Sequence, residues 1–340
     1  MNTPNLSVTE SRRRTRAIIV MLTLTILVIA AFIVSMNTGH IRLSPIDVVK
    51  TLFGWGTDKQ HLILFEFRLP RIIISVLIGA GFAVSGAILQ GLFRNPLADP
   101  GLLGINAGAG LMVTLYIAFL RDNSSANLFL LPLLALGGAA SAAVLIFMLA
   151  YKRHKGLLPT RMILIGVAVQ AGINAAMVVL TLALDPEDYQ YVSIWLAGSI
   201  AGSNWKYVIA LLPWIFTLIP FAMIKSRSLN ILNLGDQMAK GLGTPINRDR
   251  IWLLAAAVGL AGSCVAIGGG ISFVGLVGPH LARRLVGPQH QLNIPTSALL
   301  GALLVIVADT IARSFSSLPT GIIVAIIGAP YFLYLLSKTK

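Results

Sequence analysis

Residues 251–282 read IWLLAAAVGLAGSCVAIGGGISFVGLVGPHLA, a run of 32 residues without a charged side chain. A helix needs about 20 residues to cross the ~30 Å hydrocarbon core of a membrane, so this run is too long for one ordinary crossing. Three glycines, Gly268–Gly270, interrupt it, and consecutive glycines are unfavourable inside a helix. The run therefore predicts two membrane helices that meet at these glycines.

Further apolar runs of spanning length lie on both sides of this one. The chain of 340 residues is 56% hydrophobic and only 11% charged, a composition that requires lipid as its solvent. We expect an all-α integral membrane protein with about ten transmembrane helices in a single domain over residues 1–340. The remaining predicted spans are Ala17–Met36, Ile72–Phe93, Leu102–Leu120, Asn127–Tyr151, Met162–Leu184, Tyr207–Ile224, Leu292–Ala312 and Ser316–Leu336.

The distribution of charge predicts the orientation of these spans. If residues 1–16 form a cytoplasmic tail before an uncleaved first helix, 18 of the 26 basic residues but only four of the 12 acidic residues fall on the cytoplasmic side. This asymmetry follows the positive-inside rule, and it accounts for the net charge of +14 without a nucleic-acid partner. An even number of spans places both termini in the cytoplasm, and residues 226–250 form a cytoplasmic loop.

The sequence lacks the motifs of a self-sufficient pump or enzyme. It contains no Walker A pattern, no metal-ligand spacing and one cysteine, Cys264, so we expect no ATP hydrolysis, no metal and no cofactor. The spans also carry almost no carboxylates, whereas ion-driven carriers use ionisable groups near mid-membrane. Asp309 lies near the outer end of its span, and we expect it to pair locally with Arg313. The chain therefore resembles a transport pathway that takes its energy from another protein.

A short amphipathic segment lies in the predicted cytoplasmic loop. Residues 229–243 read LNILNLGDQMAKGLG, and their apolar side chains recur at helical spacing. Such a helix either lies on the membrane surface or docks in a groove of a partner protein. The segment is poorer in lysine and arginine than surface helices usually are. The apolar face consists of Ile231, Leu234, Met238, Ala239 and Leu242, with Gly235 and Gly241 between them.

Six motifs in order give the chain a specific resemblance to a known family. It is similar to FecCD-type permeases, the membrane subunits of ABC importers for iron siderophores, haem and vitamin B12, which have the type II importer bundle. The matching stretches are RLPR (68–71), SGAILQGLFRNPLADPGLLGINAGAG (85–110), LNLGDQMAKGLG (232–243), GGGISFVGLVGPHLAR (268–283), ADTIAR (308–313) and LPTGIIVAIIGAPYFLYLL (318–336).

The resemblance implies roles for particular residues. It makes the cytoplasmic segment a coupling helix on the ATPase, through Leu229, Ile231, Leu234, Gly235, Met238, Ala239, Leu242 and Gly243. It assigns Arg68, Arg71 and Arg313 to docking of an extracytoplasmic binding protein; as lone arginines they would otherwise anchor the membrane interface. It places a cytoplasmic gate at Pro159 and Thr160, although the relatives more often have small hydroxyl residues there. Short external helices are expected near Asp185–Glu187 and over Ser44–Phe53.

The expected function is that of a non-catalytic permease subunit in a bacterial cytoplasmic membrane. Its partners would be a second permease subunit, identical or related, two ATP-binding cassette subunits, a substrate-binding protein and membrane lipid. The expected cargo is a ferric siderophore, with haem or cobalamin as the alternative. An ion-coupled secondary transporter is the alternative from a different class, and a membrane enzyme is a third.

Overall fold

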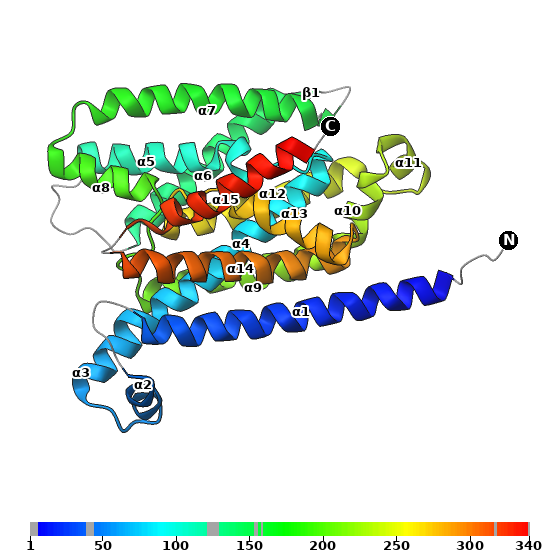
Figure 1. Cartoon of the computed structure of the whole chain (residues 1–340). Helices are drawn as coiled ribbons and strands as arrows, with labels where there is room; N and C mark the ends of the chain where they lie inside the picture. The colour runs from blue at the N-terminus through cyan, green and yellow to red at the C-terminus, as the bar shows by residue number, and fades with distance from the viewer. Residues whose placement is uncertain are drawn as a thin grey trace.

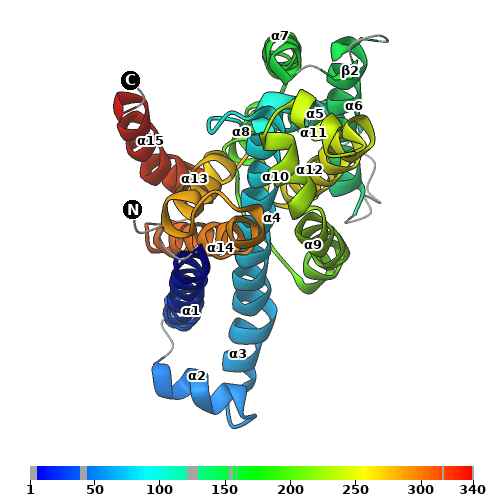
Figure 2. The same ribbon diagram turned by 90° about the vertical axis from the view of Figure 1, so that its right-hand side faces the viewer.

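The computed structural model describes residues 6–38, 44–120, 129–152, 156–157, 159–315 and 318–338. Within these ranges the protein is a bundle of long helices joined by short ones (Figures 1 and 2). The long helices are α1 (Leu6–Asn37), α4 (Leu69–Phe93), α5 (Ile105–Leu120), α6 (Leu130–Ala150), α7 (Pro159–Thr181), α9 (Trp205–Ile224), α12 (Ile246–Gly268), α13 (Val274–Val286), α14 (His290–Ser314) and α15 (Thr320–Lys338).

The connecting elements are short. Helical turns over Leu62–Arg68 (π-helical) and Pro100–Leu103 (3₁₀) precede α4 and α5, and one pair of two-residue antiparallel strands joins α6 to α7. These strands are a small departure from the all-helical expectation. The other connecting elements are α2 (Pro45–Leu52), α3 (Asp58–His61), α8 (Pro186–Leu196), α10 (Ser226–Asn233), α11 (Asp236–Gly241), β1 (Tyr151–Lys152) and β2 (Gly156–Leu157).

The long helices lie where the apolar runs predicted them. In the described ranges, seven helical segments are long and apolar enough to cross a membrane, and α5 and α15 are shorter apolar helices. The tenth, α13, has 13 residues because the glycine break shortens it. Residues 6–16, expected as a tail, already belong to α1. The expected starts of two spans, at Asn127 and Ser316, lie outside the described residues.

The predicted break at the three glycines is confirmed. Helix α12 ends at Gly268, and Gly269 has a φ of +68°, a conformation that side-chain-bearing residues rarely adopt. A Cβ at Gly269 would lie 2.2 Å from the carbonyl oxygen of Trp195, at the end of α8. The glycines therefore both end the helix and let the end of α8 pack directly on the broken backbone.

Helix α4 runs through the middle of the bundle, between α14, α13 and α12 (Figure 2). Most of its residues are buried. A Cβ on Gly79 of α4 would lie 2.2 Å from the carbonyl oxygen of Gly301 in α14, and the reverse distance is 2.1 Å. The two backbones therefore touch, as small residues allow in membrane helix packing. Ser85 adds a hydrogen bond of 2.7 Å to the carbonyl oxygen of Ala257 in α12.

The two short helices expected near Asp185–Glu187 and over Ser44–Phe53 are present, and each begins at a residue typical of a helix start; their external location stays a prediction. Ser44 caps α2 by accepting a hydrogen bond from the backbone N–H of Asp47 at 3.1 Å. Helix α8 begins at Pro186, directly after Asp185. The residues between α4 and α5 form the expected tight turn, in which Asp99 accepts a hydrogen bond from the N–H of Gly101 at 2.8 Å.

Candidate coupling surface and external arginine cluster

The amphipathic segment 229–243 forms two helices rather than the single helix that its periodicity predicts. Helix α10 ends at Asn233 and α11 begins at Asp236. Gly235 between them has a φ of +108°, which lies outside the helical region and favours glycine. The expectation of one continuous helix was therefore wrong, because a periodicity count does not register the backbone freedom of one glycine.

Three large apolar side chains of the segment are exposed: Leu234 (59%), Met238 (62%) and Leu242 (61%). We call these three residues the coupling surface. Leu229 and Ala239, from the same predicted set, are buried against the bundle, so they support the segment from within. Ile231 is half-buried, and Gly235 and Gly243 occupy positive-φ turns. A docking role for the whole set stays a prediction.

A carboxylate holds α11 in place. Asp236 binds Arg250 of α12 through two hydrogen bonds, of 3.0 and 2.6 Å, and it also pairs with Arg94 at the end of α4. Burial would raise the pKa of Asp236, but the hydrogen bonds and charges of Arg250 and Arg94 hold it below its usual value. Arg94 also donates to the carbonyl oxygen of Leu232 at 2.9 Å. The pairing therefore fixes α11 relative to two membrane helices.

Helix α10 is attached to the bundle as well. Asn230 donates a hydrogen bond to Gln291 at 2.7 Å and accepts one from the backbone N–H of His290 at 3.0 Å. Lys225, just before α10, forms an ion pair of 2.8 Å with Asp249 of α12. Contacts of this kind suit a segment that transmits motion, because a loosely attached loop would absorb a displacement rather than pass it to the helices.

The three arginines assigned to docking converge in the structure, but inside the protein. Asp309 of α14 is fully buried and binds Arg71 through Nε (3.0 Å) and Nη2 (2.8 Å). Arg313 pairs with the same carboxylate at 3.1 Å, and the Thr320 hydroxyl donates to it at 3.0 Å. We call Arg68, Arg71, Asp309 and Arg313 the external arginine cluster, after the side of the membrane that the charge pattern predicts for it. The expected pairing of Asp309 with Arg313 is thereby confirmed.

The other contacts of this cluster tie α1 to the bundle. Arg68 donates a hydrogen bond to the carbonyl oxygen of Met36, and Arg313 donates one to the Ser35 hydroxyl. Arg68 and Arg313 are buried, so the expectation of three surface cations needs correction: only Arg71, with 18% of its side chain exposed, retains partial access. Docking through these residues stays a prediction. Sequence spacing could not reveal the pairing of Arg71 with Asp309, because 238 residues separate them.

The predicted gate residues lie at the start of α7. Pro159 is the first residue of this helix, where its fixed φ and missing N–H are tolerated, and Thr160 next to it is exposed. Their gating role stays a prediction. Across the described residues, no three histidine, cysteine or acidic side chains gather in a way that could hold a metal ion, and Cys264 is a buried free thiol.

The fold defines a class of protein: a multi-pass membrane protein built as a bundle of apolar helices. The FecCD transport family matches residues 26–338. The chain belongs to this family, and it is a non-catalytic permease subunit of an ABC importer. Family membership decides against the ion-coupled secondary transporter and the membrane enzyme.

Individual relatives match along almost the whole chain. The iron(3+)-hydroxamate import system permease protein FhuG of Bacillus subtilis strain 168 is 49% identical, over 96% of this chain and 98% of that protein. The hemin transport system permease protein HmuU of Yersinia pestis is 37% identical, over 93% of this chain and 95% of that protein. An inward-facing structure of a transporter assigned to the metal-chelate ABC type superposes with a TM-score of 0.82 at 31% identity, covering 95% of this chain and 99% of that one.

The external arginine cluster predicts a large effect of removing its carboxylate. Asp309→Ala leaves Arg71 and Arg313 without their shared anion, and uncompensated buried charge costs about 3–5 kcal/mol. We expect a clear fall in the thermal unfolding midpoint of the purified protein in detergent. Asp58→Ala, at an exposed position in α3, is the control and should change the midpoint little. Equal midpoints for the two variants would contradict a structural role for Asp309.

Proposed function

We propose that this permease carries a ferric siderophore across the bacterial cytoplasmic membrane, driven by separate ATPase subunits. One comparison supports the cargo. The relative named for iron(3+)-hydroxamate import is more similar to this chain than the relative named for hemin import. Haem or cobalamin is the alternative cargo.

The observation that carries the mechanism is the exposed coupling surface. Burying a large apolar side chain stabilises a complex by ~1.5–3 kcal/mol, so Leu234, Met238 and Leu242 together offer enough to dock in a groove. An alternative is that α11 rests on the membrane surface. Lys240 is its single basic residue, however, whereas membrane-surface helices are usually rich in lysine and arginine. A groove on the ATPase subunit is therefore the favoured partner.

The importer would contain two permease subunits, identical or related, with the pathway between them. Helix α7 supports this arrangement, because only 11% of the residues in its most apolar window are buried within the subunit. The exposed Thr160 and its neighbour Pro159 would form the gate at the cytoplasmic end of that pathway. ATP-driven closure of the two ATPase subunits, passed through α10 and α11, would switch the pathway between its two open states.

A substrate-binding protein would dock on the opposite face, where Arg68, Arg71 and Arg313 lie. Acidic side chains of that protein would have to compete with Asp309 for the same guanidinium groups. Arg71 is the favoured first contact because it is the most accessible of the three. Docking would then exchange an internal ion pair for an external one, which costs less than leaving either charge unpaired.

The coupling surface predicts how transport fails when its apolar character is removed. Leu234→Asp with Met238→Asp should insert and fold, because both side chains are exposed, but should lose binding of the ATPase subunits. The measurement is co-purification of these subunits, followed by ATP-dependent uptake of a ferric hydroxamate into proteoliposomes.

The matched control is Leu52→Asp with Phe53→Asp, at exposed apolar positions at the end of α2, and it should retain ATPase binding. Normal co-purification with the Leu234/Met238 variant would show that the docking assignment is wrong. Normal ATPase binding in the unaltered importer, but uptake of haem or cobalamin in place of ferric hydroxamate, would overturn the cargo and leave the mechanism intact.

The proposed orientation predicts which positions react with an impermeant thiol reagent. In a Cys264→Ser background, Arg227→Cys and Lys240→Cys should be labelled only after the membrane is opened, because the charge asymmetry places residues 226–250 in the cytoplasm. Glu187→Cys, at the start of α8, should be labelled in intact cells. All three positions are exposed, so access within the protein does not limit labelling. Labelling of Arg227→Cys in intact cells would show that the proposed topology is wrong.

A further inference from the structure

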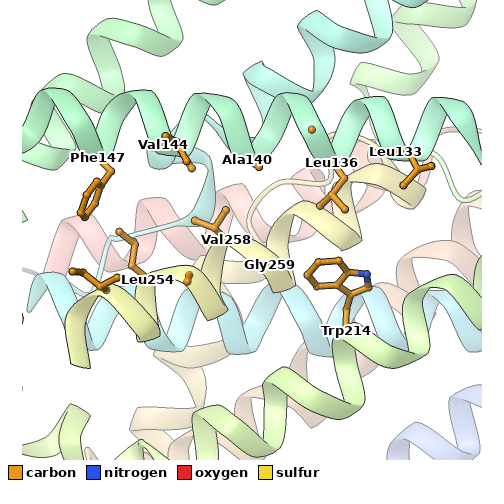
Figure 3. A pocket seen from close by; sticks show the side chains of 13 residues that line it. Leu133, Leu136, Ala140, Val144, Phe147, Trp214, Leu254, Val258 and Gly259 are labelled. Atoms are coloured by element: carbon orange, nitrogen blue, oxygen red, sulfur yellow. The ribbon is translucent and has the colours of Figure 1, made fainter. Parts of the chain in front are cut away.

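An apolar groove opens at the periphery of the bundle, between α6, α9 and α12 (Figure 3). Its volume is about 590 Å³, and no charged, hydroxyl or amide side chain lines it. Leu136, Ala140 and Phe147 of α6 form one wall, and Leu254 and Val258 of α12 form the other. Because all three helices cross the membrane, this groove faces hydrocarbon rather than water.

The groove is long and narrow. Along α6 it runs from Leu133 to Phe147, about 21 Å at 1.5 Å per residue, which exceeds half of the ~30 Å hydrocarbon core. The groove has open space at Gly137, because a Cβ there would meet no atom within 4 Å. At Gly259 the Trp214 ring packs against the backbone and narrows the groove. The lining is apolar along this whole length, so the groove suits a hydrocarbon chain.

Positive charge is present at one end of the groove. The lining positions of α12 begin at Ile251, and Arg248 lies on the same helical face one turn earlier, with its side chain exposed. On α6 the lining ends at Phe147, and Arg161 donates a hydrogen bond to the carbonyl oxygen of Leu149, just beyond. Both guanidinium groups thus lie at the end where α6 finishes and α12 starts, at the expected level of phospholipid headgroups.

We propose that the groove is a binding site for an anionic phospholipid. One acyl chain lies between α6 and α12, and Arg161 and Arg248 supply the positive charge that attracts the headgroup phosphate. The site adjoins the coupling region, because Arg250, two residues after Arg248, binds Asp236 of α11. A bound lipid would therefore contact the same end of α12 that holds the coupling surface in place.

The test uses the purified full-length chain with phosphatidylglycerol that carries a photoreactive diazirine in its acyl chain. We expect cross-links to groove residues of α6 and α12, located by mass spectrometry. Unlabelled phosphatidylglycerol should compete at least fivefold better than phosphatidylcholine, since one cation near a headgroup contributes roughly fivefold in affinity. Arg161→Gln with Arg248→Gln should keep the cross-links but lose this preference, and Lys59→Gln with Lys206→Gln, at exposed positions elsewhere, should keep it.

A filling substitution tests the groove itself. Gly137→Trp should reduce the groove cross-links severalfold, whereas Met148→Trp, at an exposed position of α6 outside the groove, should leave them unchanged. Ala140→Phe serves the same purpose if Gly137→Trp does not fold. Equal cross-linking in the filling and control variants would overturn the site. A protein–protein cross-link between two copies, formed by a bifunctional reagent in the unaltered chain and lost in Gly137→Trp, would assign the groove to a second subunit. An unchanged lipid preference in the arginine variant would overturn the headgroup assignment.

Discussion

The direct contact between the backbones of α4 and its neighbours is the constraint on which the rest of the structure depends. In hydrocarbon no hydrophobic force drives helices together, so association relies on close packing and on hydrogen bonds between helices. Gly79 against Gly301, and Ser85 bonded to Ala257, provide both. Larger side chains at the two glycines would separate α4 from α14 and displace every element attached to their ends.

The external arginine cluster and the ion pairs of Asp236 lie at opposite ends of α4. Arg71 at its start binds Asp309 of α14, and Arg94 directly after its end binds Asp236 of α11. Asp236 also binds Arg250 of α12, and Asp309 also accepts a hydrogen bond from Thr320 of α15, so each end of the central helix is joined to two other elements. In the proposed importer, α4 would thus join the docking face to the coupling surface and would transmit displacements between the two sides of the membrane.

Much of the fold could be predicted from sequence because a membrane permits few structures. Every backbone polar group must be bonded internally, so long apolar runs become helices, and Gly268–Gly270 had to end one. That residues 229–243 form short helices between α9 and α12 could be predicted from their isolated amphipathic pattern. The break at Gly235 and the convergence of Arg71 on Asp309 could not be predicted from the sequence. The first depends on one backbone conformation, and the second depends on helices that only the folded bundle brings together.

The central claim is that the coupling surface meets the ATPase. Hydrogen–deuterium exchange of the permease, alone and in the assembled importer, measures this contact directly. We predict slower exchange at residues 234–242 upon assembly, because Leu234, Met238 and Leu242 are exposed in the isolated chain and would be covered in the complex. Unchanged exchange at residues 234–242, together with protection of a different cytoplasmic segment, would contradict contact between the coupling surface and the ATPase.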